Sequence, residues 1–289
     1  MYTFIYPETV DYFHCYQRPQ QLLNGFGKLG YNSIFLNPQN KYRRNHFVEK
    51  LENVWLINKS INENKKYENK KYEKINEIAK GTKKVLWITY PKQYKLVEKF
   101  NPDIVVYDII DDAVEEFTHW ASYVYKMIGK ADIVTCSANE LYNKFKNLHP
   151  NVYLIKNAAD FEHFYNVNFK EIRTLKRINK PIIGYYGVLA SWLDYELIKY
   201  MADKFPNYSF VYIGEYFVKR FRLPKRKNIY YLGHISYSEL PFYSNYFDVC
   251  IIPFKKTDMI KSCNPIKLWE YLSMGKPVVA TNIEELKEI

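Results

Sequence analysis

The sequence predicts an α/β protein with two Rossmann-like domains, each a doubly wound parallel sheet, and three observations support this prediction. Short apolar runs alternate with helix-length segments along the chain, as they do where crossover helices connect parallel strands. A chain of 289 residues exceeds the usual size of a single core. The alternation is interrupted by one polar, basic stretch, NVNFKEIRTLKRINK. We therefore expect one domain at 1–165, a linker at 166–180 and a second domain at 181–289.

The first domain is expected to begin with a buried strand at Tyr2–Tyr6 and a helix over 18–29 that Gly30 ends. Apolar runs of four or five residues then predict six further strands, and amphipathic segments predict three further helices. The strands are expected at 33–36, 54–57, 85–89, 104–108, 133–137 and 152–155, and the helices at 93–100, 121–129 and 139–148.

In the second domain three predicted strands end in glycine: PIIGYYG at Gly187, SFVYIG at Gly214 and IYYLG at Gly233. A helix through Lys204 follows the first of them, and a further strand is expected at 248–254. Ligands of such sheets bind at the carboxyl ends of the strands, where glycine lets the backbone approach a ligand closely. The carboxyl edge of this sheet is therefore the predicted binding site.

The chain carries a net charge of +11, and region 41–84 contributes 13 − 6 = +7 from 13 Lys/Arg and 6 Glu. Part of this region, NKKYENKKYEKI, contains a five-residue unit repeated once. Two interpretations remain open: a solvated helix or loop, or a basic, aromatic-containing patch that rests on an anionic membrane surface.

The sequence shows neither the pattern of a signal peptide nor an apolar run long enough to span a bilayer. Its four cysteines, Cys15, Cys136, Cys250 and Cys263, form no CxxC pair, which favours a reducing compartment. We expect a cytoplasmic protein, with peripheral contact to the inner face of the cell membrane if the basic region binds lipid. We expect no metal site and no nucleic-acid partner, because neither ligand spacing nor a recognised module is present.

The stretch SCNPIKLWEYLSMGKPVVAT (262–281) predicts a helix followed by a strand. Asn264 is a favourable N-cap, Pro265 a favourable first helical residue, and Gly275 ends the helix. The start of such a helix suits a phosphate or diphosphate, with Lys267 in its first turn. Glu270 lies on the same side and can accept hydrogen bonds from a ribose diol. A capped helix with a surface Lys–Glu pair explains the same residues equally well.

This stretch resembles the donor-site signature of retaining glycosyltransferases of family 4, which have the GT-B fold. YQRPQQLLNGFGKLGYNSIFLNP (16–38) resembles a segment of bacterial polysaccharide enzymes, including teichuronic-acid-type glycosyltransferases. The resemblance continues in VVYDIIDDAVEEF, ADIVTCSANELYNKF, LIKNAADFEHF and NIYYLGHISYSELPFYSNYFDVCIIPF. It implies two domains facing across a cleft and metal-independent hexosyl transfer from a UDP- or GDP-sugar. The acceptor would be a glycan or lipid-linked molecule of envelope or capsular polysaccharide synthesis.

The resemblance also implies roles for particular residues of the second domain. Gly187 would let the diphosphate approach, Gly233 and His234 would lie beside the base, and Glu270 would hold the ribose hydroxyls. The diphosphate or the sugar would meet the loop and helix start formed by Ser262, Asn264, Pro265, Ile266 and Lys267. The expected mechanism is front-face displacement, in which the leaving diphosphate helps to deprotonate the incoming hydroxyl.

The first domain supplies the candidate acceptor residues. Asp111 and Asp112 follow a predicted strand, where a carboxylate would orient the acceptor hydroxyl or stabilise positive charge on the sugar. The alternative is a helix N-cap and a first-turn acid. His14, Gln17 and Arg18 lie after the first strand and would also meet the acceptor, although Arg18 equally fits a structural ion pair. Asp111, Lys267 and Glu270 are the expected catalytic residues.

The sequence departs from the family pattern at several positions. Ser262 stands where the family often has a glutamate that touches sugar hydroxyls, and Asn157 precedes alanine rather than the usual glycine. Ser191, Trp192 and Asp194 lie where an arginine and a lysine are common. Family members also continue beyond PVVAT, so we expect an incomplete second domain. A non-catalytic relative that binds anions or a membrane surface is the alternative function.

Overall fold

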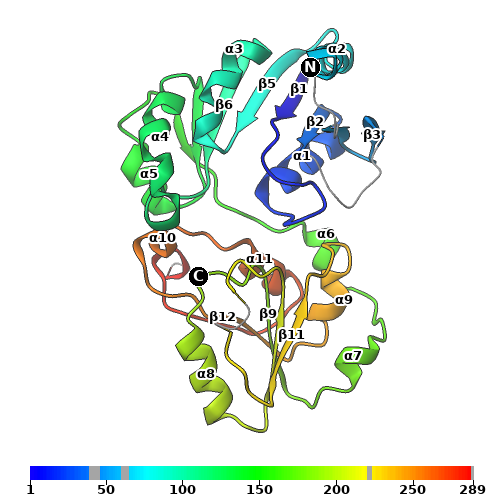
Figure 1. Ribbon diagram of the computed structural model, residues 1–289, viewed down its shortest axis with the longest axis vertical. Coiled ribbons are helices and arrows are strands. Elements are labelled where there is room, and N and C mark those ends of the chain that lie inside the picture. Colours follow the sequence, from blue (N-terminus) through cyan, green and yellow to red (C-terminus); the bar gives the residue numbers. More distant parts are fainter. Residues whose placement is uncertain (39–45, 60–64, 220–222, 288–289) are drawn as a thin grey trace. The chain divides into compact units, whose positions relative to one another are not determined.

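The computed structural model describes residues 1–38, 46–59, 65–219 and 223–287. It forms two compact units, Met1–Lys156 and Asn157–Ile289, each built on its own sheet (Figure 1). The stretch expected as a linker lies within the second unit. It contains helix α7 (Arg173–Lys176) and buries Ile172, Leu175 and Ile178. Three apolar side chains in that basic stretch thus contribute to a core.

The first unit is an eight-stranded sheet in the order β3-β4-β2-β1-β5-β6-β7-β8. All neighbours pair in parallel except β3 with β4. The sequence predicted every strand but β3, whose three residues VEK carry no clear apolar alternation. The strands are β1 (Tyr2–Tyr6), β2 (Asn32–Asn37), β3 (Val48–Lys50), β4 (Trp55–Asn58), β5 (Lys83–Ile88), β6 (Ile104–Ile109), β7 (Ile133–Cys136) and β8 (Val152–Leu154).

Helices cover both faces of this sheet, and neighbouring residues of one strand enter different cores because side chains alternate along a strand. Leu86 packs in one core and Trp87 in the other. The helix expected over 93–100 is divided into the 3-10 helix η1 (Pro91–Lys95) and the short α3 (Leu96–Phe100). The remaining helices are α1 (Arg18–Lys28), α2 (Lys65–Ile78), the 3-10 helix η2 (Glu115–Trp120), α4 (Ala121–Ile128) and α5 (Asn139–Phe145).

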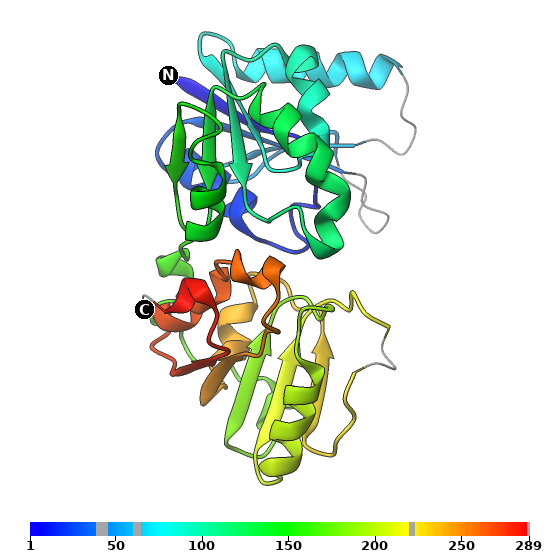
Figure 2. The same ribbon diagram turned by 90° about the vertical axis from the view of Figure 1, so that its left-hand side faces the viewer.

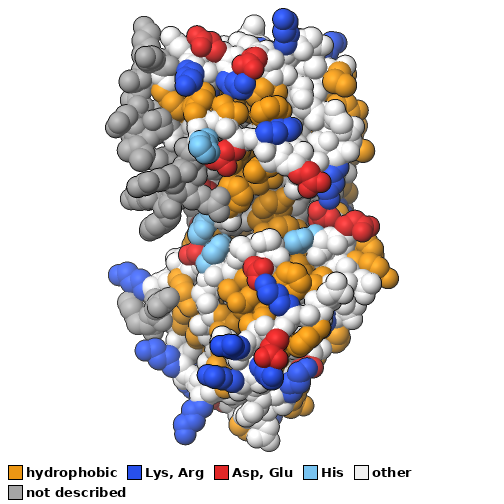
Figure 3. Space-filling view, turned by 90° about the vertical axis from the view of Figure 1, so that its right-hand side faces the viewer, with side chains coloured by type: hydrophobic (Ala, Val, Ile, Leu, Met, Phe, Trp, Pro, Cys, Tyr) orange, Lys and Arg blue, Asp and Glu red, His pale blue; other side chains and the backbone are white. Residues whose placement is uncertain are grey.

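Helix α2 contains most of the repeated basic segment, and two of its described lysines make ion pairs within the unit. Lys71 is 6% exposed, and its Nζ lies 3.1 Å from both Glu8 and Glu68. Lys74 pairs with Glu77 at 2.7 Å. On the face of the first unit drawn in Figure 3, Lys and Arg side chains alternate with Asp and Glu. The helical interpretation of this segment is therefore confirmed for 65–78, whereas 39–45 and 60–64 lie outside the described residues.

The second unit is a five-stranded parallel sheet in the order β11-β10-β9-β12-β13. Its strands are β9 (Ile182–Tyr186), β10 (Ser209–Ile213), β11 (Ile229–Gly233), β12 (Val249–Ile252) and β13 (Val278–Ala280). Helix α8 (Tyr195–Lys204) flanks the sheet in the views of Figures 1 and 2. The other helices are α6 (Phe161–Phe164), α7, α9 (Leu240–Ser244), α10 (Asp258–Lys261), α11 (Ile266–Ser273) and the 3-10 helix η4 (Glu284–Leu286). Among the described residues of the chain, no helix has the length and apolar character that crossing a membrane requires.

Candidate donor and acceptor sites

Three glycines form the carboxyl edge of the second sheet, where β9, β10 and β11 end side by side. Gly187, Gly214 and Gly233 have φ angles of 133°, 148° and 74°, which L side chains rarely adopt. The Gly187 amide donates to the carbonyl of Ile213 at 2.9 Å, and the Gly214 amide donates to that of Gly233 at 2.8 Å. A Cβ added at Gly214 would lie 1.9 Å from the Gly187 oxygen. The edge is therefore a close-packed backbone surface that only glycine allows.

Lys267, in the first turn of α11, brings a positive charge to this edge. A Cβ added at Gly187 would lie 2.9 Å from its Cε and 3.4 Å from its Nζ. The ammonium lies 5.5 Å from the ring centroid of Tyr185 and 5.0 Å from that of Phe254, which is the range of cation–π contacts. Burial lowers the pKa of Lys267, and the nearby Cys263 and Glu270 partly offset this effect. Among the described residues no carboxylate forms an ion pair with it.

Glu270, one turn further along α11, is buried with 4% exposure. Its Oε2 accepts a hydrogen bond of 2.8 Å from the hydroxyl of Tyr186, the last residue of β9. The amide of Tyr186 donates in turn to the hydroxyl of Tyr271 at 3.0 Å. The surface Lys–Glu pair that the sequence left open is therefore wrong, because Glu270 is buried against β9.

The start of α11 differs from the sequence prediction by one residue. Pro265 is the N-cap and Ile266 the first helical residue, whereas Asn264 and Pro265 were expected there. The Oδ1 of Asn264 accepts from the indole of Trp269 at 3.0 Å, and its carbonyl accepts from the side-chain amide of Asn157 at 2.6 Å. Asn264 therefore holds the loop before the helix, and the first-turn amide of Leu268 donates to the carbonyl of the N-cap Pro265 at 3.1 Å.

The positions that depart from the family pattern have structural roles here. The side chain of Asp194 accepts from the amide of Leu197 at 2.9 Å and caps α8. The Nζ of Lys255 donates to the carbonyl of Ser191 at 2.6 Å, and its amide donates to that of Trp192 at 2.8 Å. Ser262 is buried, and its amide donates to the carbonyl of Met259 at the end of α10. The loop after β9 is thus held by a cation from the loop after β12.

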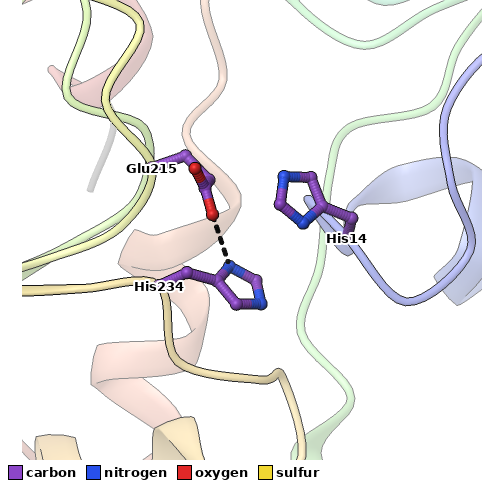
Figure 4. A group of neighbouring side chains, drawn as sticks. All are labelled: His14, Glu215 and His234. Carbon is purple, nitrogen blue, oxygen red and sulfur yellow. Dashed lines mark ion pairs between the residues drawn. The ribbon is translucent and has the colours of Figure 1, made fainter. Parts of the chain in front are cut away.

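His234 and Glu215 follow the glycines that end β11 and β10. The Nδ1 of His234 lies 3.4 Å from Oε1 of Glu215, and both side chains are partly exposed (Figure 4). The His14 side chain drawn in the same figure belongs to the first unit. The structure therefore brings His234 to the glycine edge and gives it an acidic partner that the sequence analysis did not single out.

In the first unit, Arg18 forms a buried bidentate pair with Asp108, at the end of β6. Its Nε lies 2.8 Å from Oδ2, and its second terminal nitrogen lies 3.0 Å from Oδ1. Trp87 and Thr135 donate to the same carboxylate at 3.1 Å and 2.7 Å. Asp108 is fully buried and Arg18 is 5% exposed. The structural ion pair that the sequence allowed for Arg18 is thus present, and it ties α1 to the sheet.

The remaining acceptor candidates differ in their surroundings. Asp112 is buried and accepts from Lys144 at 2.6 Å and from the amide of Ala113 at 2.8 Å. Asp111 is partly buried, and this desolvation raises its pKa from the usual 3.8 to about 6. Gln17 precedes α1, and its amide donates to the side chain of Gln20 at 3.2 Å, whereas His14 is exposed. Burial thus raises the pKa of the Asp111 carboxyl group, which makes its carboxylate a stronger base than usual.

The sequence analysis missed Tyr186, Tyr271 and Asp108 as partners of the residues that it singled out. A tyrosine pair directly before Gly187 was visible in PIIGYYG. Nothing in the local pattern, however, shows that one of these hydroxyls meets a glutamate 84 residues further along the chain.

Comparison with known proteins shows which family and which folds the chain resembles. Residues 180–289 match the model of the family Glycosyl transferases group 1. Sucrose-phosphate synthase from Thermosynechococcus elongatus superimposes with a TM-score of 0.68 at 14% identity, covering 99% of this chain and 83% of that one. Anabaena Alr3699/HepE, solved with UDP and glucose, gives 0.63 at 13% identity, covering 99% and 82%. The chain thus has the fold of GT-B glycosyltransferases, and its family resemblance is confirmed.

The chain also resembles a particular bacterial protein. The chain is 28% identical over 229 residues to TuaH of Bacillus subtilis (strain 168), whose name assigns it to teichuronic acid biosynthesis as a glycosyltransferase. The match covers 71% of this chain and 57% of the relative. The resemblance to teichuronic-acid-type glycosyltransferases that the sequence indicated is therefore confirmed.

Proposed function

We propose that the chain is a hexosyltransferase that moves a sugar, with retention, from a nucleotide-diphosphate sugar to an acceptor of cell-envelope or capsular polysaccharide synthesis. The observation that carries this proposal is the carboxyl edge of the second sheet. There helix α11 lies beside the glycine backbone at Gly187. The helix contributes the ammonium of Lys267, which has no carboxylate partner among the described residues, and the buried carboxyl group of Glu270. This combination suits a diphosphate joined to a ribose.

In the proposed donor site each group of residues would have a separate role. The diphosphate would lie against Gly187 and the first turn of α11, where the helix dipole and Lys267 offset the charge that develops on the leaving group. Glu270 would accept hydrogen bonds from the ribose hydroxyls. Gly233 and His234 would lie beside the base, at the end of β11. Ser262, Asn264, Pro265 and Ile266 would shape the loop near the sugar.

The acceptor side is proposed for the first unit. Asp111 would orient the incoming hydroxyl or stabilise positive charge on the transferred sugar, because its carboxyl group ionises within the neutral range. The hydroxyl proton would pass to the leaving diphosphate, which departs from the face that the acceptor attacks. His14, Gln17, Arg18 and Asp112 would line the same region, and Arg18 would do so while it is paired with Asp108.

The substrate class is supported by the proteins that the chain resembles. Alr3699/HepE was solved with UDP and glucose, and starch synthase IV of Arabidopsis thaliana with ADP and acarbose. The Bacillus relative is named for teichuronic acid biosynthesis. We therefore propose a UDP- or GDP-sugar as donor and a glycan or lipid-linked acceptor, used in the cytoplasm or at the inner membrane surface.

The test is isothermal titration of the full chain with UDP, GDP and their common sugars, followed by an assay of sugar release. We expect saturable binding of one diphosphate. Lys267→Met should weaken this binding about 100-fold, because a charge-assisted contact is lost while the side chain still packs on Gly187. Glu270→Ala should also weaken it without unfolding the protein.

The matched control is Lys276→Met, just beyond the other end of α11. The Lys276 ammonium is also partly buried and donates to the carbonyl of Asn245 at 2.8 Å. This variant should bind the diphosphate as the parent does. A folded protein that binds no diphosphate would refute the donor site. Binding without release or transfer of sugar, for any donor that binds, would favour the non-catalytic alternative.

A further inference from the structure

Tyr186 is held between two consecutive residues of α11. Its backbone amide donates to the hydroxyl of Tyr271 at 3.0 Å, and its own hydroxyl donates to Oε2 of Glu270 at 2.8 Å. The rings of Tyr186 and Tyr271 also meet edge to face, with centroids 4.7 Å apart. All three side chains are buried. The end of β9 and helix α11 are thus joined by two hydrogen bonds, both donated by Tyr186.

The hydroxyl of Tyr186 is the donor in the bond to Glu270. Burial raises the pKa of Tyr186 well above its usual value, and the charge of Glu270 raises it further. The phenol therefore keeps its proton across the physiological range. The bond constrains the Oε2 atom of Glu270 and thereby the orientation of the whole carboxyl group.

We infer that Tyr186 is a positioning residue that holds Glu270 in the orientation required to bind the ribose diol, and so determines selectivity for ribonucleotide donors. This inference rests on the proposed function, because it needs a nucleotide at the glycine edge. A glutamate side chain loses considerable rotamer freedom when it is fixed in one orientation. A neighbour that fixes it before the ligand arrives removes that cost from binding.

A purely structural role for Tyr186 makes a different prediction. Its ring packs edge to face on Tyr271 and lies 6.4 Å from the ring of Phe164. These ring contacts and the backbone bond to Tyr271 do not involve the hydroxyl. Tyr186→Phe keeps all of them and removes only the bond to Glu270. If only the ring of Tyr186 mattered, the variant would bind nucleotides with the affinities of the parent. If the substitution loosened the site in general, the affinities for all nucleotides would fall by the same factor.

The experiment compares ribonucleotides with nucleotides that lack the diol. UDP and GDP are titrated into the full chain beside their 2′,3′-dideoxy counterparts, for the parent and for Tyr186→Phe. We expect the variant to bind the ribonucleotide about tenfold more weakly, since a hydrogen bond to a charged group no longer positions the carboxylate. Its affinity for the dideoxy form should change less than twofold.

Tyr212→Phe is the matched control. Tyr212 is a fully buried tyrosine of the neighbouring strand β10, and its hydroxyl has no hydrogen-bond partner among the described residues. Removal of this hydroxyl should leave the discrimination between ribose and dideoxyribose intact. Glu270→Gln provides a second measurement, because Tyr186→Phe added to it should cause no further loss of discrimination.

The outcomes separate this inference from the proposed function. If the parent binds neither diphosphate, the proposed function fails and the inference fails with it. The positioning role is wrong if the parent binds a diphosphate but Tyr186→Phe lowers the affinities for the ribose and dideoxyribose forms equally, or changes neither affinity. In that case the donor site stands. A selective loss for the ribose form supports both.

Discussion

The two sheets end in different kinds of edge, although both are parallel and doubly wound. In the second unit three of the five strands end at or directly before a glycine, and the edge that they form is backbone with the Lys267 ammonium close to Gly187. In the first unit polar side chains lie near the strand ends. The carboxylate of Asp108 accepts hydrogen bonds from three residues, Arg18, Trp87 and Thr135. The same topology thus presents main-chain atoms in one unit and a network of polar side chains in the other.

Under the proposed function, the difference would adapt a common fold to two substrates. A diphosphate is large and anionic, so its site benefits from missing side chains and from amide dipoles at close range. An acceptor hydroxyl is small and neutral, so its site needs a carboxyl group of suitable pKa held by a rigid frame. In the proposed acceptor site the buried pair of Arg18 and Asp108 would be that frame, and Asp111 lies three residues beyond Asp108.

The largest effect is expected from breaking the frame of the first unit. Arg18→Met should lower the free energy of unfolding of that unit by about 4 kcal/mol, because it leaves the charge of Asp108 buried without its cation. Hydrogen exchange of the β6 and β7 amides, measured in urea, would report the loss.

The control for this variant is Lys144→Met, which removes a cation from the half-exposed pair with Asp112. It should cost less than about 1 kcal/mol. If the two variants proved equally harmful, the contrast between a buried frame and a surface pair would be wrong. An unchanged second unit in both variants would show that the two edges are stabilised separately.

A smaller effect is expected when a side chain is added to the backbone edge. Gly187→Ala should destabilise the second unit by about 2–3 kcal/mol, because strained φ adds to contacts of 2.9 Å with Lys267 and 3.0 Å with Tyr185. It should also weaken diphosphate binding by displacing the ammonium. Thermal unfolding and titration with the diphosphate measure the two effects.

Gly233→Ala is the comparison within the same edge. A Cβ added there would meet no atom within 4 Å, and only the φ of 74° opposes it. We expect a cost of about 1 kcal/mol. Equal costs at the two glycines would mean that backbone conformation, and not close approach, determines the edge.

The smallest effect is expected at Asp111, where a substitution should stabilise the first unit instead of destabilising it. Its pKa is about 6 in the folded protein and about 3.8 when unfolded, so the folded state binds more protons between these values. Stability of the first unit should therefore fall as pH rises from about 4 to about 6. Asp111→Asn should remove this dependence and raise the free energy of unfolding of the first unit at pH 8. Urea unfolding at a series of pH values tests the sign.

The same variant separates the two units in function. Asp111→Asn should leave diphosphate affinity unchanged and reduce sugar transfer, and the parent's activity should rise with an apparent pKa near 6. A rate of sugar transfer equal to that of the parent would show that Asp111 takes no part in the reaction. A changed affinity for the diphosphate would contradict the separation of donor and acceptor roles.

The fold was predictable because every strand except β3 contains a short apolar run, and segments of helical pattern separate many of these runs. The site was predictable only in part. Gly187, Gly233, Lys267 and Glu270 carry local signals, namely strand-ending glycines and a helix start. The roles of Asn264 and Arg18 were ambiguous, because a polar side chain near a helix start serves as a cap, a ligand or an anchor according to its neighbours.

The sequence by itself determined the alternation of strands and helices, the glycines at the strand ends and the residues at the start of α11. These follow from interactions between residues close together in the chain, which periodicity and turn chemistry reveal. Only the tertiary structure decided that Tyr186 meets Glu270, that Arg18 meets Asp108 and that Lys267 lies over Gly187. Such pairs are separated by 80 or more residues, and they exist because parallel strands bring their carboxyl ends to one edge.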